Sequence, residues 1–332
     1  MGIDPVEIAQ VGPSWGSSVH FRALDPMEAL AMRITVNTPA GHIGRVVVEQ
    51  LLAANETVVI ISRHPAKVAD LVARGAQLVE GSIDDPSVLD RALHGQDALF
   101  WLTPFVARAD YMEWAPRAAN LSAAAVRKNG VQRVVLISSV GAQRESGLGP
   151  VGVLPAIERA FREAAPDITA LRAGHFMENY LNYAEMIAAT GVIFSPYPAA
   201  RPLPIVATRD IGRKAADALR DPAWKGFRTL GVHGPEDLDQ TTAARLIGLG
   251  IGRPVKYVEI GVAEAKQGML DNGVPAEMVT LLADMYTGLR AGLMERAEPR
   301  TAETTTPTTL LEFSREVLKP AVDAAARRGS NV

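Results

Sequence analysis

The sequence has no cysteine among its 332 residues. This absence excludes disulfide bonds, thiolate metal ligands and cysteine nucleophiles. Its six histidines are scattered without metal-ligand spacing, so we predict no metal site. Neither acidic nor basic residues form a long run, and the formal net charge is -3, which argues against a nucleic-acid partner.

Long hydrophobic runs are also missing from the sequence. The longest apolar stretches, such as residues 98–102, are far too short to span a bilayer. The N-terminus lacks the basic start and apolar core of a secretory signal. We therefore expect a cytoplasmic protein that does not associate with membranes. The hydrophobic fraction of 48% is ordinary for a globular chain, which is long enough for one large domain or two unequal ones.

Residues 1–31 are rich in Gly, Pro and Ser and lack periodicity, which predicts a loose N-terminal extension. Apolar strands and amphipathic helices alternate from Met32 onward. The predicted strands are 33–36, 57–61, 76–79, 98–102, 133–137 and 168–172, and the predicted helices are 43–53, 65–72, 86–93, 110–128 and 154–165. Helices between successive strands predict parallel pairing through right-handed crossovers.

The pattern becomes irregular after residue 172, where prolines cluster at 196–204. Strands are predicted at 229–232 and 255–260, and helices at 210–219, 241–249, 262–270, 276–289 and 309–318. We predict an α/β protein with a Rossmann-type, doubly wound parallel sheet at 32–190. A smaller α+β cap domain is expected at 191–325, with some segments returning to the sheet.

A glycine-containing turn follows the first predicted strand. The Rossmann fingerprint has glycine at its first, fourth and seventh positions, and this chain has Thr38, Gly41 and Gly44 there. Gly41 would let the backbone approach a pyrophosphate, and the next helix would offer free N–H groups to the anion. Because Thr38 departs from the pattern, we expect a differently shaped first turn. A turn that needs glycine for geometry alone is the alternative.

Basic residues follow the second predicted strand, where NAD-preferring sites usually carry an acidic side chain. Ser62 and Arg63 offer a hydroxyl and a planar donor fork, and Lys67 adds a nearby charge. This pattern favours the 2′-phosphate of NADPH and makes NADH the less favoured cofactor. Two solvated charges on a surface loop are the alternative interpretation.

Together these segments resemble the NmrA-like branch of the atypical short-chain dehydrogenases/reductases, with the nearest pattern in bacterial NADPH:quinone oxidoreductases and NADPH-sensing members. The resemblance rests on the order and spacing of TPAGHIG at 38–44, SRHPAK at 62–67, residues 79–100, VVLISSVGA at 134–142, ITALRAGHFMENYL at 168–181, residues 207–219 and TPTTLLEF at 306–313. It implies a Rossmann core, a small C-terminal domain and a cleft between them.

The resemblance also assigns positions to individual residues. Those it implies at the cofactor are Thr38, Gly41, His42, Ile43 and Gly44 at the pyrophosphate, Arg63 and Lys67 at the 2′-phosphate, Thr103 and Pro104 beside the cofactor, and Ser138 and Ser139 at the nicotinamide half. His175, Phe176 and Asn179 would border the substrate pocket. The chain departs from the family at Ser82, where an aspartate is frequent, and at Leu154, where reductase branches often have lysine.

Tyr-x-x-x-Lys, the usual catalytic pair of short-chain dehydrogenases, is absent, because none of the six tyrosines has lysine four positions later. A quinone needs less acid assistance than a ketone, so water or the hydroxyl of Ser138 could suffice. His175 is the candidate acid, because it follows a strand and an ordinary histidine titrates near neutrality. A hydrogen-bonded structural role for His175 stays open. Tyr180 and Tyr183 could shape an aromatic pocket or belong to the core.

Two functions remain open from the sequence. One is an NADPH-dependent reductase that transfers hydride to a quinone or similar electron-poor small molecule. The other is a non-catalytic NADPH/NADP⁺ sensor that regulates a protein partner. A roomy apolar pocket beside His175 and Asn179 would favour the enzyme, and a closed face would favour the sensor. The sequence leaves a homodimer open.

Overall fold

The computed structural model describes residues 31–329. The strands of the described chain are β1 (Arg33–Asn37), β2 (Thr57–Ser62), β3 (Gln77–Glu80), β4 (Ala98–Trp101), β5 (Arg133–Ser139), β6 (Asp167–Ala173), β7 (His175–Phe176), β8 (Val192–Ser195), β9 (Leu203–Val206), β10 (Phe227–Val232), β11 (Asp237–Leu238) and β12 (Lys256–Glu259). The predicted N-terminal extension lies outside the described residues, apart from residue 31.

The helices are α1 (His42–Ala53), α2 (Ala69–Ala73), α3 (Pro86–Leu93), α4 (Tyr111–Asn129), α5 (Leu154–Arg162), α6 (Ala184–Thr190), α7 (Thr208–Arg220), α8 (Gln240–Ile251), α9 (Val262–Asp271), α10 (Ala276–Arg290), α11 (Leu310–Phe313) and α12 (Lys319–Gly329). Shorter turns are η1 (Pro65–Val68), η2 (Gly149–Val153), η3 (Met177–Tyr183) and the π-helical turn η4 (Ser314–Leu318). In residues 31–329 no helix combines the length and apolarity needed to cross a bilayer.

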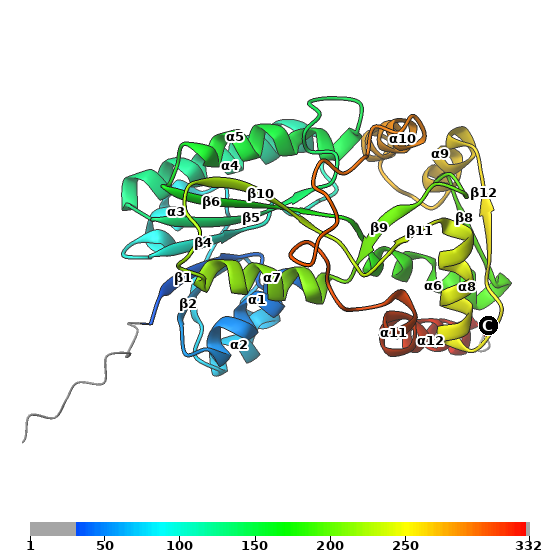
Figure 1. Ribbon diagram of the computed structural model, residues 1–332, viewed down its shortest axis with the longest axis horizontal. Coiled ribbons are helices and arrows are strands. Elements are labelled where there is room, and N and C mark those ends of the chain that lie inside the picture. Colours follow the sequence, from blue (N-terminus) through cyan, green and yellow to red (C-terminus); the bar gives the residue numbers. More distant parts are fainter. Residues whose placement is uncertain (1–30, 330–332) are drawn as a thin grey trace, which may run out of the picture. The chain divides into compact units, whose positions relative to one another are not determined.

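The central sheet has seven strands in the order β10-β6-β5-β4-β1-β2-β3, and every pairing is parallel. The Rossmann prediction is therefore confirmed, with β10 added beside β6. Strand order reverses between β1 and β4, and ligands of such sheets bind at the carboxyl ends near that point. Figure 1 shows the sheet edge-on, with its carboxyl ends toward the smaller part of the fold.

Alternating side chains of the buried strands supply a core on each face of the sheet. Ile34 and Ile60 pack with α1 and α7 on one face, whereas Leu99 and Trp101 pack with α3, α4 and α5 on the other (Figure 1). Helix α7 approaches α1 closely at Gly212, where an added Cβ would lie 2.7 Å from Cβ of Val46. The segment that follows the predicted Rossmann region and carries α7 and β10 thus completes the sheet. Helices then cover both faces of the sheet, and this burial stabilises it.

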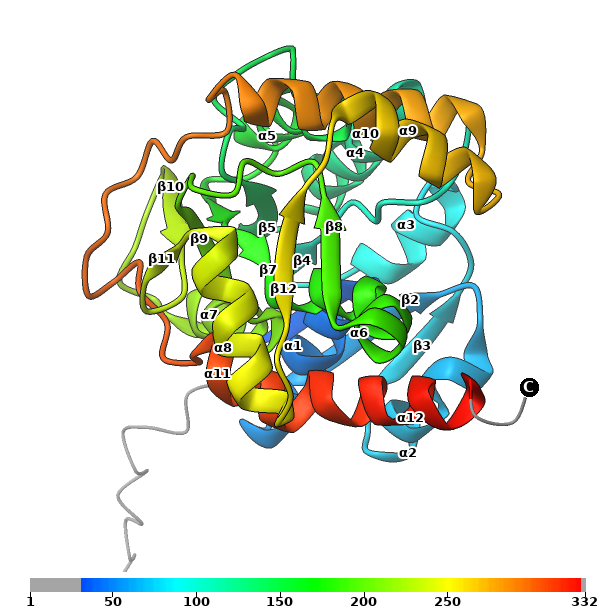
Figure 2. The same ribbon diagram turned by 90° about the vertical axis from the view of Figure 1, so that its right-hand side faces the viewer.

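The smaller part contains a three-stranded sheet, β11-β9-β7, and a parallel pair, β8 and β12. A third core, with Ile187, Ile247, Phe313 and Val322 among its members, joins helices α6, α8, α11 and α12 (Figure 2). The sequence missed strands β7, β8, β9 and β11. Strands β7 and β11 have only two residues each, and β8 and β9 adjoin or enter the proline cluster at 196–204, which hides the strand pattern.

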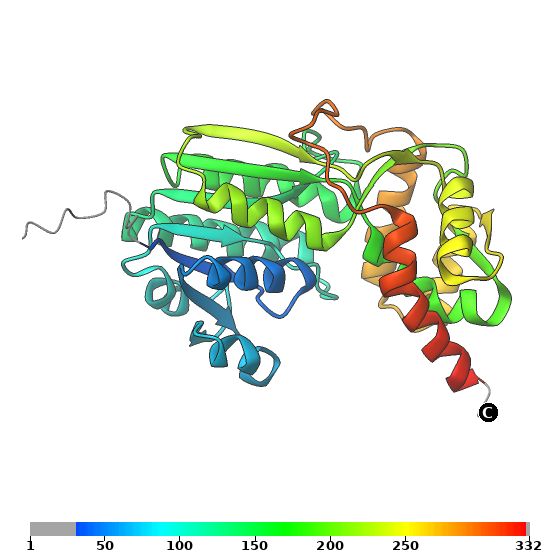
Figure 3. The same cartoon turned by 60° about the horizontal axis from the view of Figure 1, so that its bottom comes forward.

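The C-terminal helix is longer than predicted. We expected a helix over 309–318, but the chain continues through η4 into α12 and ends that helix at Gly329. Pro320 does not stop it, because it comes just after the π-helical turn η4, where the regular α-helical hydrogen-bonding pattern is already interrupted. Figure 3 shows α12 running out along the smaller part, where Arg328 pairs with Glu185 of α6. The predicted boundary at Leu318 was therefore wrong.

Candidate functional site

The turn after β1 keeps a glycine-like backbone even though threonine begins it. Thr38 has φ of 53°, in the left-handed region that glycine favours, and its carbonyl accepts a hydrogen bond from N–H of Gly41 at 3.1 Å. At Gly44, an added Cβ would lie 2.3 Å from the Thr38 carbonyl oxygen. Thr38 itself therefore adopts the strained left-handed conformation, and the expected difference in the shape of this turn stays a prediction.

This turn leaves hydrogen-bonding groups free for an anion. Helix α1 begins at His42, its N-cap Gly41 provides no side-chain acceptor, and no acidic residue lies in the first turn. The hydroxyl of Thr38 is buried and has no hydrogen-bond partner among the described residues. Free helix N-terminal amides and an unpaired hydroxyl are the groups that bind phosphate oxygens. The turn of Thr38, Gly41, His42, Ile43 and Gly44, called the cradle below, therefore has groups suited to a diphosphate, and Thr38 and Gly41 line the cavity described next.

A cavity of about 520 Å³, the cofactor cavity, opens in front of the cradle. Its walls include Ser62, Arg63 and Lys67 after β2, and Pro104 after β4. The side chains of Arg63 and Lys67 are exposed, and within residues 31–329 neither has a hydrogen-bond or ion-pair partner. Ser62 is buried and accepts a hydrogen bond from N–H of His64 at 3.1 Å. Two unpaired cations at one end of the cavity suit a phosphate monoester.

Three further residues of the cofactor cavity were missed by the sequence analysis. Asp84 accepts a hydrogen bond from Nε1 of Trp114 at 2.8 Å, and hydrogen bonding from Ser82 lowers the pKa of Asp84. Arg108 stacks over the Trp114 ring at 4.7 Å from its centroid. These side chains come from the loop after β3, from the loop before α4 and from α4, so only the fold brings them together.

Asn37, the last residue of β1, fixes the strand-order reversal. It is fully buried, and its side-chain amide donates to the carbonyl of Leu102 at 2.8 Å while its oxygen accepts from N–H of Leu102 at 2.8 Å. This pair of bonds holds the loop after β4 beside the cradle. In the sequence, the polar Asn37 at the end of a mostly apolar strand is the feature that could have indicated this role.

A second cavity of about 480 Å³, the acceptor cavity, lies at the same edge of the sheet. The predicted residues that it brings together are Thr103, Ser138, Ser139, His175, Phe176 and Asn179. Helix α10 closes the cavity with Leu282, Met285 and Tyr286, which the sequence did not assign to a site. Thr103 and Pro104 are thus divided between the two cavities.

His175 is enclosed by aromatic rings. The rings of Tyr180 and Tyr197 meet it edge-on, with centroids 5.9 and 5.2 Å away, and the Tyr197 hydroxyl lies 3.4 Å from Nδ1 of His175. Burial lowers the pKa of His175 to about 4. The expectation that this histidine titrates near neutrality was wrong, because the surrounding rings cannot solvate an imidazolium. At neutral pH the ring is uncharged.

The hydroxyl of Ser138 is already engaged. It donates to Oε1 of Glu158 at 2.6 Å, and Arg172 donates to both oxygens of that carboxylate, from Nε at 3.0 Å and from a terminal nitrogen at 2.8 Å. Arg172 also donates to Glu298, on the segment that follows α10, at 2.9 Å. This buried network orients Ser138 so that its oxygen, rather than its proton, is available toward the cavity.

Tyrosines other than Tyr180 form the aromatic wall of the acceptor cavity. Tyr180 is buried in the third core, and its hydroxyl donates to Gln240 at 3.1 Å. Tyr183, Tyr197 and Tyr286 line the cavity, and the rings of Tyr197 and Tyr286 meet edge-on at 5.5 Å. Burial raises the pKa of all three phenols, so they stay protonated.

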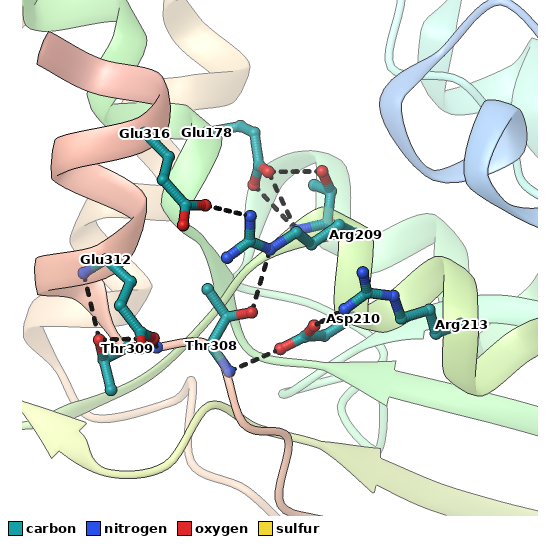
Figure 4. Close-up of polar contacts among 9 residues, drawn as sticks. Glu178, Arg209, Asp210, Arg213, Thr308, Thr309, Glu312 and Glu316 are labelled. Carbon is teal, nitrogen blue, oxygen red and sulfur yellow. Dashed lines mark hydrogen bonds and ion pairs between the residues drawn. The ribbon is translucent and has the colours of Figure 1, made fainter.

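A polar junction anchors the segment that carries Asn179. Glu178 accepts hydrogen bonds from N–H and the hydroxyl of Thr208, the latter at 2.6 Å, and so caps the start of α7. On the other side, buried Asp210 accepts from N–H of Thr308 at 2.9 Å, and Arg209 donates to the Thr308 hydroxyl at 3.1 Å (Figure 4). These bonds join η3, α7 and the C-terminal segment.

Residues 31–313 match the NmrA-like family, and the chain belongs to that family. An NAD(P)H azoreductase of Xenophilus azovorans is 31% identical over 246 residues, which are 74% of this chain and 83% of the relative.

Two solved structures share the fold. An NADPH-dependent quinone oxidoreductase of Escherichia coli, crystallised with NADPH, has a TM-score of 0.73 at 22% identity and covers 85% of this chain and 98% of its own. NmrA, a negative transcriptional regulator crystallised with NADP, has a TM-score of 0.68 at 16% identity and covers 89% and 97% of the two chains. The fold is thus found both in an enzyme and in a regulator.

Proposed function

We propose that this protein is an NADPH-dependent oxidoreductase that reduces a quinone or a similar electron-poor acceptor. The observation that carries the proposal is the acceptor cavity, which lies beside His175 and Asn179 at the same sheet edge as the diphosphate cradle. A cavity of about 480 Å³ is in the range of small-molecule sites. The azoreductase and quinone oxidoreductase relatives support the same reaction class.

The cofactor would lie with its diphosphate on the cradle at Thr38, Gly41 and Gly44. Arg63 and Lys67 would receive the 2′-phosphate, and this pair favours NADPH over NADH because NADH carries no group for them to bind. Ser138 and Ser139, which end β5, line the acceptor cavity and would face the nicotinamide half. When bound, the dinucleotide supplies the hydride.

Reduction of a quinone consumes one hydride and one proton and gives a hydroquinone. The residues around the cavity would position the quinone and stabilise the added charge with neutral donors: the amide of Asn179 and the hydroxyl of Tyr197, with uncharged His175 orienting that hydroxyl. A hydroquinone anion is a weak base, so solvent can supply the proton. The absent Tyr-x-x-x-Lys pair is compatible with this chemistry.

A dinucleotide sensor is the second candidate function. The Ser138 hydroxyl is committed to Glu158, and Leu154 lines the cavity where reductase branches often have lysine, so no strong acid faces the acceptor. NmrA, a regulator crystallised with NADP, shares the fold. The open acceptor cavity favours the enzyme, since a sensor needs no second small-molecule site.

The proposal is tested by following NADPH consumption with a panel of benzoquinones, naphthoquinones and azo dyes. We expect turnover above the non-enzymatic rate for at least one quinone. A Met285→Trp variant, which fills the acceptor cavity, should lose turnover but retain NADPH binding, whereas Leu270→Trp on exposed α9 should retain both. NADPH binding without turnover for any acceptor would contradict the enzyme and support the sensor.

A further inference from the structure

We propose that the acceptor cavity selects uncharged, planar aromatic acceptors and rejects related acceptors that carry a sulfonate, carboxylate or phosphate group. This inference rests on the proposed function, because it defines the acceptor that the reductase would take. Its basis is that charged side chains line the cofactor cavity, whereas the wall of the acceptor cavity is uncharged.

No charged side chain of the described chain lines the acceptor cavity. Its wall has no Asp, Glu, Lys or Arg residue, and His175 is neutral at physiological pH. Behind Ser138, Glu158 and Glu298 share the guanidinium of Arg172. That guanidinium is fully occupied, so it leaves no cation to receive an anionic acceptor.

The polar groups that do face the cavity are neutral hydrogen-bonding groups. Asn179 and Asn182 present amides, and Tyr183 and Tyr197 present protonated phenols. Such groups can donate to a carbonyl or azo nitrogen but cannot neutralise a full negative charge. The cavity can therefore orient a dione without requiring a charge on it.

The aromatic rings in the wall of the acceptor cavity favour planar aromatic acceptors. Tyr197 and Tyr286 meet edge-on, and Phe105, Phe176 and Tyr111 contribute further rings to the wall. Aromatic walls favour offset or edge-on contacts with another ring. A planar aromatic acceptor gains these contacts, and an aliphatic acceptor of the same volume gains fewer.

An anionic substituent would be disfavoured twice. It would lose hydration on entering a cavity that offers no ion partner. It would also approach the negatively charged dinucleotide in a partly enclosed space, where Coulomb repulsion is screened less than in water. The cofactor cavity is the opposite case, because the three cations Arg63, Lys67 and Arg108 line it beside one carboxylate, Asp84.

The experiment compares two quinones that differ in one substituent, menadione (2-methyl-1,4-naphthoquinone) and 1,4-naphthoquinone-2-sulfonate. Binding of each is measured by calorimetry with the complex of 1,4,5,6-tetrahydro-NADP, whose ring is uncharged like that of NADPH and transfers no hydride, and kcat/KM is measured with NADPH. The chain has no cysteine, so thiol addition to the quinones does not interfere. The sulfonate withdraws electrons, so intrinsic reactivity favours the anionic quinone, and its rate with NADPH alone is the reference.

We expect menadione to bind at least tenfold more tightly than the sulfonate and to be the better substrate despite its lower intrinsic reactivity. A Met285→Lys variant places a cation in the wall, and Met285→Gln is its uncharged control of similar length. The lysine variant should shift the binding ratio toward the sulfonate at least tenfold relative to the glutamine variant.

The outcomes separate the two proposals. Equal or tighter binding of the sulfonate by the unmodified protein would overturn the charge selection, whether or not turnover occurs. An unchanged ratio between the lysine and glutamine variants would also overturn it. Selective binding of menadione without turnover would support the charge selection while contradicting the reductase function.

Discussion

The two cavities at the carboxyl edge of the sheet are opposite in construction. The cofactor cavity offers backbone amides and the cations Arg63, Lys67 and Arg108, whereas the acceptor cavity offers aromatic rings and neutral hydrogen-bonding groups. One is suited to a polyanion and the other to an uncharged ring. The contrast teaches that one sheet edge can hold a charged cofactor and a neutral substrate side by side, because each cavity draws on different loops.

The two cavities also differ in how their residues are recruited. The cofactor cavity comes from residues 38–114, close to the first four strands. The acceptor cavity needs residues from 102 to 294, and α10 closes it from a distant part of the sequence. Changes in the first should therefore alter dinucleotide affinity alone, and changes in the second should alter acceptor kinetics alone. Three experiments test this separation, and a fourth tests the neutral state of His175.

The largest effect is expected for Gly44→Ala in the cradle. The added Cβ would lie 2.3 Å from the Thr38 carbonyl oxygen, so α1 must shift. We expect about 3 kcal/mol of lost stability, the upper end for overpacking, together with loss of dinucleotide binding. Thermal unfolding and NADPH titration measure both. Gly261→Ala, which meets open space, is the control, and an unchanged affinity in Gly44→Ala would contradict the cradle assignment.

Arg63→Ala tests whether the cofactor cavity binds the 2′-phosphate through Arg63. We expect NADPH binding to weaken by ~1.5–3 kcal/mol, the range for hydrogen bonds to charged groups, while NADH binding stays nearly unchanged. Titration with both reduced dinucleotides measures the difference. Arg127→Ala on the exposed face of α4 serves as the control. Equal losses for NADPH and NADH would remove Arg63 from the 2′-phosphate site.

Glu178→Ala tests the anchoring of the acceptor side. The substitution leaves N–H and the hydroxyl of buried Thr208 without their acceptor, so we expect a loss of about 1–2 kcal/mol in unfolding free energy. Acceptor KM should rise because Asn179 is displaced, with NADPH affinity retained. The control is Glu316→Ala, which removes an exposed partner of Arg209 and should cost less than about 1 kcal/mol (Figure 4). A parallel loss of NADPH affinity in Glu178→Ala would contradict the independence of the two cavities.

The smallest effect near neutral pH comes from the buried histidines. Burial lowers the pKa of both His175 and His233 to about 4. Unfolded histidines take up a proton near pH 6.5, so the unfolded state binds more protons between about pH 6.5 and 4, and stability falls as the pH falls through that window. Chemical denaturation at several pH values measures the slope. His175→Asn should reduce the slope, and an unaltered slope would contradict the burial of a neutral His175.

The sequence predicted the Rossmann part well for a physical reason. Buried parallel strands read as short apolar runs, and Gly41 and Gly44 mark a backbone geometry that few other residues allow. Basic Arg63 and Lys67 lie only a few positions beyond a strand end, so their place in the cofactor cavity followed from the strand. The same local reasoning missed Asp84, Arg108 and Trp114, since their meeting depends on loop paths.

Predictions for the acceptor side were less complete. His175, Phe176 and Asn179 were found because they follow β6, but the low pKa of His175 depends on how the chain after it packs, with Tyr180 and Tyr197 against its ring. The engagement of the Ser138 hydroxyl by Glu158 requires α5 to pack against β5. Tyr180 and Tyr183 are three residues apart, and only packing placed one in the core and the other in the cavity.

By itself, the sequence determined the parallel sheet, the glycine-containing turn after β1 and the basic residues after β2, because these depend on local backbone geometry and on residues next to strand ends. Tertiary structure alone decided the charge and protonation state of the acceptor cavity. Burial and pairing there join separate elements of the fold, some of them distant in sequence, such as Arg172 with Glu298, whose separation is 126 residues. Desolvation depends on everything that surrounds a group, and no local stretch of sequence specifies those surroundings.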